Sequence, residues 1–208
     1  MNKLIFGVGV NDLPYMTDVR EWVTKDGGKK IRKLVFRCKY YAVWSSMLER
    51  CYSKKYLESK PSYISTSVCN EWLYASEFKK WMEKQDWEGK CLDKDIIVPG
   101  NRLYSPDTCA FVLASTNSFV IARDACRGEY PVGVDLHKYM GKYRAQCGNP
   151  FIREQEHLGL FSTPEDAHEA WRKRKHEIAQ LVAATESNPR IVAALKKRYS
   201  FEEWYKLT

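Results

Sequence analysis

The stretch CLDKDIIVPGNRLYSPDTCAFVLASTN, residues 91–117, is the part of this chain that says most about its fold. Residues 90–98 predict a strand, and Pro99 with Gly100 predicts a β-turn at its end. A second turn signal, the sequence SPDT, comes before a short apolar piece at residues 110–112. The stretch therefore predicts a small core of short elements that are separated by tight turns.

Further motifs lie on the amino-terminal side of this stretch and in a fixed order. GVGVND comes first, W-x-x-M-L-x-R-C-Y follows at residues 44–52, and V-C-x-E-W follows at residues 68–72. Together with LDKDI, GN and YSPDTC, these motifs resemble the phage-encoded HNH endonucleases, including free-standing homing endonucleases. The resemblance covers most of residues 5–120. It implies a ββα core with flanking helices and an activity that cuts or nicks duplex DNA with the help of a metal ion.

The resemblance assigns roles to four positions of this chain. It implies that Asp93 and Asn117 are ligands of a magnesium ion and that Lys94 occupies the position of the general base. Thr108 falls where the family has an asparagine that braces the loop. The catalytic set that the resemblance implies is therefore Asp93, Lys94 and Asn117, with Mg²⁺ as cofactor.

Lys94 leaves the activity of such a core open. Residues 1–136 contain no histidine, so no imidazole of that segment can act as the base. A lysine acts as a base only when burial or positive neighbours favour its neutral form, and Asp93 and Asp95 on either side favour the charged form. The two alternatives are an active magnesium-dependent endonuclease and a degenerate core that keeps the fold without the chemistry.

The carboxy-terminal half begins with a different pattern. YPVGVDLHKYMGKYRAQC, residues 130–147, consists of two alternating runs joined near Met140 and Gly141, which predicts a β-hairpin. Residues 153–161 predict a third strand. Thr163 and Pro164 then supply an N-cap and a first helical residue. The sequence predicts three strands backed by one helix.

The predicted helix is amphipathic. Its apolar face is expected to pack on the strands, and the opposite face is expected to be basic. The apolar set is Ala167, Ala170, Trp171, Ile178, Leu181 and Val182. The basic set is Arg172, Lys173, Lys175 and His176.

Residues 129–185 resemble the ERF-type DNA-binding domain, the three-stranded module first known from plant APETALA-type regulators. The signature consists of Gly133-Val134, the run GKYRA at residues 141–145, Leu158-Gly159, Phe161, Ala167 and Ala170. The resemblance implies that the sheet lies in the major groove of double-stranded DNA and that the helix backs it.

Strand alternation gives candidate DNA contacts on one side of this sheet. Lys142, Arg144 and Gln146 alternate with apolar residues, so they are expected to point outward and to donate to bases or phosphates. Arg144 is the candidate base reader, and Lys142 is the candidate phosphate contact. Three further candidates are His137, Asp135 and Arg153. Asp135 either accepts a hydrogen bond from cytosine or only orders Arg144.

Composition agrees with a polyanionic partner. The chain has 34 lysines and arginines against 26 aspartates and glutamates, a formal net charge of +8. No run of about 18 apolar residues predicts a membrane span, and the start has no signal-peptide pattern. The seven cysteines form no C-x-x-C pair, which argues against a four-thiolate zinc site and a disulfide scaffold. We expect reduced thiols and a cytoplasmic location, which is the host cytoplasm if the protein is phage-encoded.

The sequence as a whole predicts an α+β protein. The expected parts are an HNH-like domain at residues 1–125, an ERF-type domain at residues 129–185 and carboxy-terminal helices at residues 186–208. The first part is expected to contain a hairpin that turns at Gly27 and Gly28. A helix is expected to bury Trp44, Met47, Leu48 and Cys51, which recur at helical spacing, and Trp44, Trp72 and Trp81 are expected to lie in the core. The expected function is a DNA-binding endonuclease. The alternatives are a non-catalytic, sequence-specific DNA-binding regulator and a protein-interaction module, and the oligomeric state stays open.

Overall fold

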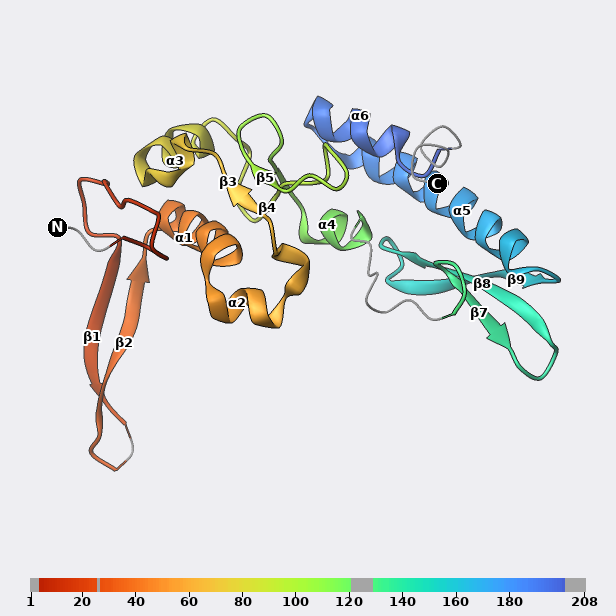
Figure 1. The fold of residues 1–208 in the computed structure, drawn as a ribbon, viewed down its shortest axis with the longest axis horizontal. Helices are drawn as coiled ribbons and strands as arrows, with labels where there is room; N and C mark the ends of the chain where they lie inside the picture. Colours follow the sequence, from red (N-terminus) through yellow and green to blue (C-terminus); the bar gives the residue numbers. More distant parts are fainter. Residues whose placement is uncertain (1–3, 26, 121–128, 201–208) are drawn as a thin grey trace. The chain divides into compact units, whose positions relative to one another are not determined.

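The computed structural model is a mixed α+β protein and describes residues 4–25, 27–120 and 129–200 (Figure 1). Its contacts divide the chain into two units, Met1–Phe111 and Val112–Thr208. The domain limits expected from the sequence stay predictions. The helix expected over residues 200–207 falls, apart from Ser200, outside the described residues.

The first unit begins with a two-stranded antiparallel ribbon. Strand β1 spans Asp18–Thr24 and strand β2 spans Lys30–Arg37. Gly27 and Gly28 lie between them with positive φ angles of 90° and 80°, which only glycine adopts without strain. The predicted hairpin and its turn are therefore confirmed.

Helix α1, Lys39–Tyr52, follows the ribbon and packs inward through the side chains predicted from helical spacing. Its buried residues are Trp44, Met47, Leu48 and Cys51. Trp44 Nε1 donates a 2.8 Å hydrogen bond to the Trp72 carbonyl, which satisfies the polar atom of a fully buried ring. Trp72 also lies 4.5 Å from the Trp81 ring, centroid to centroid. These tryptophans belong to the core, as expected.

The remaining elements of this unit are short. They are α2 (Lys54–Ser59), η1 (Pro61–Tyr63), β3 (Ser67–Val68), η2 (Glu71–Leu73), α3 (Ala75–Met82), β4 (Cys91–Asp93), β5 (Leu103–Tyr104) and β6 (Ala110–Val112). Strand β3 pairs with β5 in parallel, and β4 pairs with β6.

The strand predicted over residues 90–98 is shorter than expected, because β4 ends at Asp93. The Asp93 Oδ1 atom accepts hydrogen bonds from the backbone N–H groups of Asp95 (2.9 Å) and Ile96 (2.6 Å). Such a side-chain turn takes these donors away from a strand ladder. The turn predicted at Pro99 and Gly100 is present, with Gly100 at φ 75°.

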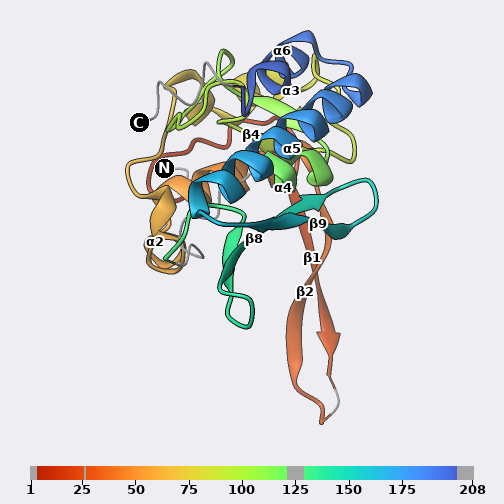
Figure 2. The same cartoon turned by 90° about the vertical axis from the view of Figure 1, so that its right-hand side faces the viewer.

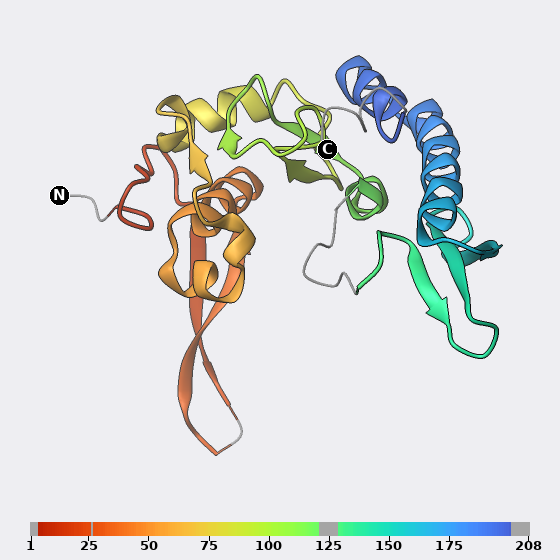
Figure 3. The same ribbon diagram turned by 45° about the vertical axis from the view of Figure 1, so that its right-hand side comes forward.

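The second unit contains the three-stranded sheet that the sequence predicted. Helix α4 spans Ala114–Val120, and strands β7 (Val134–His137), β8 (Lys142–Asn149) and β9 (Glu154–Phe161) form an antiparallel sheet in the order β7-β8-β9. Helix α5, Pro164–Thr185, lies along one side of the sheet (Figures 1 and 2). Helix α6, Pro189–Lys197, runs beside α5 (Figure 3). Thr163 caps α5 as predicted, because its side chain accepts from the Asp166 N–H.

The inward face of α5 differs from the predicted one. Leu181 is 51% exposed, whereas Arg172 is buried and Lys175 is half-buried. The Lys175 ammonium lies 3.6 Å from the centre of the Phe119 ring and donates to the Phe119 carbonyl at 2.9 Å. Burial lowers the pKa of this ammonium to about 8. The aliphatic part of the Lys175 side chain thus packs where an apolar side chain was expected.

Gly133 sets how closely α5 approaches the sheet. It has φ 81°, and a Cβ atom at this position would overlap the indole ring of Trp171 in α5. The Trp171 ring is also stacked on His168, whose Nδ1 atom lies 2.9 Å from the Val132 carbonyl. The strand entry and the helix therefore meet at a position that admits only glycine.

We expect Gly133→Ala to destabilise the second unit by about 2–4 kcal/mol, because the new methyl adds overlap to a left-handed backbone. The matched control is Gly141→Ala, where φ is 60° but a Cβ meets no atom within 4 Å. Only the backbone strain, about 1 kcal/mol, applies to that control. Urea unfolding of both variants measures the difference, and equal losses would contradict the close-contact explanation.

Candidate nucleic-acid interface

The two sides of the β7-β8-β9 sheet have different compositions. Ala145 and Cys147 of β8 are fully buried on the side that faces α5. The residues between them in β8 point to the other side, as alternation requires. Paired residues share a face, so the outer face carries Asp135 and His137 of β7, Lys142, Arg144 and Gln146 of β8, and Gln155, His157 and Leu160 of β9.

Arg144 is held in place at the middle of this outer face. Its guanidinium donates to the Asp135 carboxylate at 3.0 Å from Nε and at 2.9 Å from Nη2. Both side chains are more than a third exposed, so the pair is open to solvent. The two-point contact fixes the plane of the guanidinium and leaves Nη1 for another acceptor. Asp135 thus orders Arg144, which was one of its two predicted roles.

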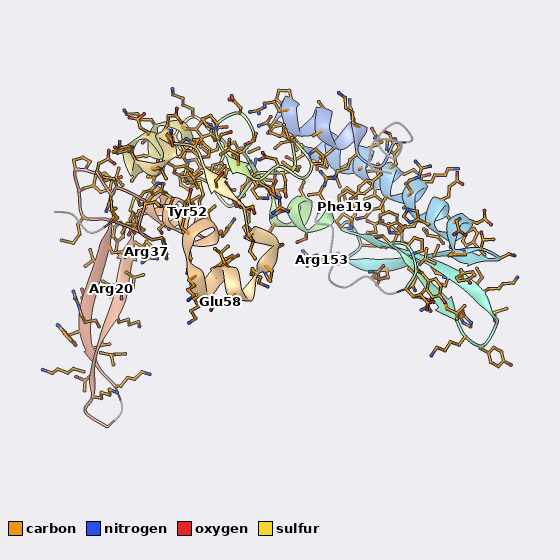
Figure 4. All side chains as sticks on the ribbon, in the orientation of Figure 1. Arg20, Arg37, Tyr52, Glu58, Phe119 and Arg153 are labelled. Atoms are coloured by element: carbon orange, nitrogen blue, oxygen red, sulfur yellow. The ribbon has the colours of Figure 1, made fainter. Side chains whose placement is uncertain are left out.

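Lys142 and His137 extend the polar face toward the β7-β8 turn. They are paired across the two strands, and Lys142 is exposed. Gln146 lies on the same face, opposite His157 of β9. Arg153 is not in the third strand as predicted. It lies in the turn before β9 with φ 57°, so it stands at the rim of the sheet (Figure 4).

Several exposed residues of this face were missed by sequence reasoning. Gln155 and His157 join it from β9, because the register shifts between Ala145 and Gln146. Such a bulge is not encoded in simple alternation, so no signal in the strand pattern places them. Tyr139, at the tip of the β7-β8 turn, is 97% exposed next to Lys138. An aromatic ring beside a lysine at a turn tip was a signal that the sequence did offer.

The sheet is fastened to α5 by a polar cluster on its inner side. Arg174 of α5 donates to Glu156 of β9 at 2.6 Å from Nε and at 3.0 Å from Nη2. Asn149 of β8 donates to the same carboxylate at 2.6 Å. The Arg174 hydrogen bonds, followed by that of Asn149, lower the pKa of Glu156 to about 2. This cluster joins two strands and the helix that backs them.

The residues to which the nuclease resemblance assigned roles lie outside this sheet. Asp93 belongs to the first unit and Asn117 to the second. The Asp93 carboxyl is buried, and its Oδ1 atom is occupied by two backbone N–H groups. Burial, with the nearby charge of Asp95 second, raises the pKa of Asp93 above its usual range. Both effects suit a structural acceptor better than a metal ligand.

The neighbours of Asp93 also have local roles. Lys94 Nζ lies 3.0 Å from the Asp95 carboxylate and 5.7 Å from the centre of the Tyr63 ring. Asn101 Nδ2 donates to the carbonyls of Lys94 (2.8 Å) and Leu103 (2.7 Å) and so braces the loop. The Thr108 hydroxyl also donates to the Leu103 carbonyl, at 2.7 Å.

The residues present do not fit a magnesium ion. Within the described ranges, no three His, Cys, Asp or Glu side chains come together as a metal site. Asn117 Oδ1 is buried and has no hydrogen-bond partner among the described residues. The other predicted ligand, Asp93, already accepts two backbone hydrogen bonds in the turn after β4. Because Mg²⁺ needs several oxygen ligands in near-octahedral geometry, no catalytic step follows from this arrangement.

The second unit therefore contains a three-stranded antiparallel sheet that is backed by one helix and has a polar outer face. The chain is 36% identical over 74 residues to the ethylene-responsive transcription factor ERF119 of Arabidopsis thaliana. The match covers 36% of this chain and 22% of that protein, so the chain spans about a fifth of the length of this curated relative. The match supports an ERF-type domain. No known family profile and no solved structure match the chain.

The cluster of Arg174, Glu156 and Asn149 that joins the sheet to α5 can be tested by its dependence on pH. The pKa of Glu156 is lower in the folded protein than its ordinary value of 4.5. The hydrogen bonds from Arg174 and Asn149 to its carboxylate therefore stabilise the fold fully above pH 4.5, and this stabilisation is lost as the pH falls toward about 2. We expect Glu156→Gln to lower stability by about 1 kcal/mol at neutral pH, because the partly exposed ion pair is lost. The difference from wild type should shrink from pH 4.5 to pH 2.

Thermal unfolding over this pH range measures the effect. Glu154→Gln is the control, since Glu154 is an exposed carboxylate of the same strand. A wild-type to Glu156→Gln difference that stays constant across the range would contradict the linkage.

Proposed function

We propose that this chain is a DNA-binding protein and that the outer face of β7-β8-β9 is its contact with duplex DNA. The observation that carries the proposal is the Asp135–Arg144 pair, which holds a guanidinium on an open sheet face beside the exposed Lys142. The partial similarity to a plant transcription factor supports the same partner. None of the described helices combines the length and the apolar character that a membrane span needs.

The chemistry of the outer face suits two kinds of contact. A guanidinium held in one plane suits the O6 and N7 acceptors of guanine, which a bidentate arginine recognises in the major groove. Lys142 is a mobile point charge that suits a phosphate oxygen. Gln146 and His157 add further hydrogen-bond donors and acceptors to the face. The face can therefore both position the duplex and read it.

Replacement of Lys142 and Arg144 tests the proposal. We expect Lys142→Ala to weaken binding to all duplexes and to reduce the slope of log K against log salt concentration by about 0.9. We expect Arg144→Ala to cost about 1–3 kcal/mol on the preferred sequence and to relax the preference at one base pair. Selection from a random duplex pool, followed by fluorescence anisotropy over a salt series, measures both effects.

The matched control is Lys173→Ala, which removes one exposed charge from α5 in the same unit. Equal effects of Lys142→Ala and Lys173→Ala would contradict the assignment of the face. Failure of the wild-type chain to bind any duplex would leave the protein-interaction module as the function.

The finer function, metal-dependent cleavage by a phage-type HNH endonuclease, stays a prediction from resemblance. The Asp93 carboxyl accepts hydrogen bonds from two backbone N–H groups, and Lys94 forms an ion pair with Asp95. Both contacts favour the alternative of a DNA-binding regulator that does not cut. Lys94 Nζ donates to the Asp95 carboxylate in this pair, so its contact in the structure is an ion pair. We therefore propose binding without cleavage.

A plasmid assay decides between these alternatives. We expect supercoiled plasmid to stay intact with the full chain and Mg²⁺ or Mn²⁺, because the Asp93 carboxyl accepts from two backbone N–H groups and Lys94 is paired with Asp95. Gel electrophoresis separates supercoiled, nicked and linear forms. Nicking that Asp93→Ala abolishes, while Asp86→Ala does not, would establish the nuclease and overturn the regulator.

A further inference from the structure

The β1-β2 ribbon is a largely exposed element of the first unit. Nearly all of β2 is exposed, and β1 and β2 form a sheet of two strands only. The ribbon projects from the rest of its unit in every view (Figures 1, 2 and 3). An isolated hairpin is at best marginally stable in water, so its length needs another explanation.

The base of the ribbon is anchored to the body of the unit. Arg37 makes a bidentate pair with Asp18, at 2.8 Å from Nε and 2.7 Å from Nη2. The Cys38 N–H donates to the Thr17 carbonyl at 2.8 Å, immediately before α1. The ribbon is therefore held in a defined direction where it leaves α1, although its far part stands in solvent.

The two faces of the ribbon differ, as the register shows. Trp22 pairs with Arg32, Arg20 with Leu34 and Thr24 with Lys30, so these residues share one face. We call this set, Arg20, Trp22, Thr24, Lys30, Arg32 and Leu34, the basic face. On the other face Val23 pairs with Ile31 and Val19 with Phe36, and the charges of Glu21 and Lys33 oppose each other.

Trp22 lies among the positive charges of the basic face. Its ring is 68% exposed, and the Arg32 guanidinium carbon lies 5.9 Å from the ring centre. Figure 4 shows Arg20 projecting from the same ribbon. An exposed aromatic ring next to arginines and lysines suits an interface with a polyanion, because the ring adds apolar contact area while the cations neutralise phosphates.

Protection of open strand edges is the competing explanation for these charges. Lysines and a bulge do protect edges from pairing with another chain, and the ribbon has a register shift between Val19 and Arg20. Edge protection, however, works with charges on either face. It does not account for the charges of the paired residues beyond the base. Arg20, Lys30 and Arg32 share one face, where the pairs from Arg20 to Thr24 contain no acid, whereas Glu21 is paired with Lys33 on the other face.

We infer that the β1-β2 ribbon is a second contact with duplex DNA, which enters the major groove with its basic face toward the duplex. The major groove is about 12 Å wide and admits a two-stranded ribbon. The right-handed twist of such a ribbon helps it to follow the groove. Arg20, Lys30 and Arg32 neutralise phosphates, and Trp22 packs against the sugar–phosphate wall. The ribbon does not depend on the β7-β8-β9 sheet, which belongs to the other unit.

The test compares duplex DNA with duplex RNA of the same sequence, using the full chain. We expect Arg20→Ala with Arg32→Ala to weaken DNA binding about tenfold or more and to reduce the salt slope by about 1.8. The major groove of duplex RNA is too deep and narrow for side chains to read, so RNA affinity should change much less. Fluorescence anisotropy over a salt series measures both.

Two further variants guard against misfolding and general charge effects. Thr24→Lys adds a cation to the basic face and should strengthen DNA binding, a gain that an unfolded ribbon cannot give. Lys54→Ala with Lys55→Ala removes two exposed charges from α2 of the same unit and should change affinity less than twofold.

The outcomes separate this inference from the proposed function. Equal losses in the ribbon and α2 variants, or equal losses on DNA and RNA, would overturn groove entry by the ribbon. Loss of binding only in Lys142→Ala with Arg144→Ala would leave the sheet as the DNA contact and refute the ribbon. Binding that depends only on the ribbon would refute the sheet and support the inference.

Discussion

The close packing of α5 on the β7-β8-β9 sheet is the constraint on which the candidate interface depends. The helix can approach because small residues line the contact: Ala145 and Cys147 on the strands and Ala167 on the helix are fully buried. Gly133 leaves the space that Trp171 fills. When one face of a three-stranded sheet is covered this tightly, the other face needs no apolar partner, and polar side chains can occupy it without cost to the core. The free outer face is a consequence of how the inner face packs.

The sequence predicts most of the elements here because each carries a local signal. The spacing of Trp44, Met47, Leu48 and Cys51 is helical, and those four residues are the buried ones of α1. Gly27 and Gly28 mark a real turn, and Thr163 and Pro164 mark the real start of α5. Such signals depend on neighbours in the chain, so they can be read without knowledge of the tertiary structure.

The parts that could not be predicted depend on contacts between distant residues. A lysine at position 175 is expected on the polar side of α5, but in the structure its ammonium lies over the ring of Phe119. The pattern of residues 90–98 is that of a strand, but the Asp93 side chain captures two backbone donors and ends it. The bulge in β9, where Leu158 has no partner opposite Ala145 and Gln146, sets His157 on the outer face. For the candidate site, the sequence therefore identified Lys142, Arg144 and Gln146 on that face, but not their neighbours from β9.

The polar residues of the loop that follows β4 have structural roles of their own. Asp93 ends a strand, Asn101 bridges the carbonyls of Lys94 and Leu103, and Thr108 bonds to Leu103 as well. Each of these polar residues satisfies a backbone group that would otherwise be unpaired in a loop with little regular structure. Their replacement would cost stability whether or not a metal ever binds. The hydrogen bonds of Asp93, Asn101 and Thr108 therefore give these residues a structural role that needs no metal ion.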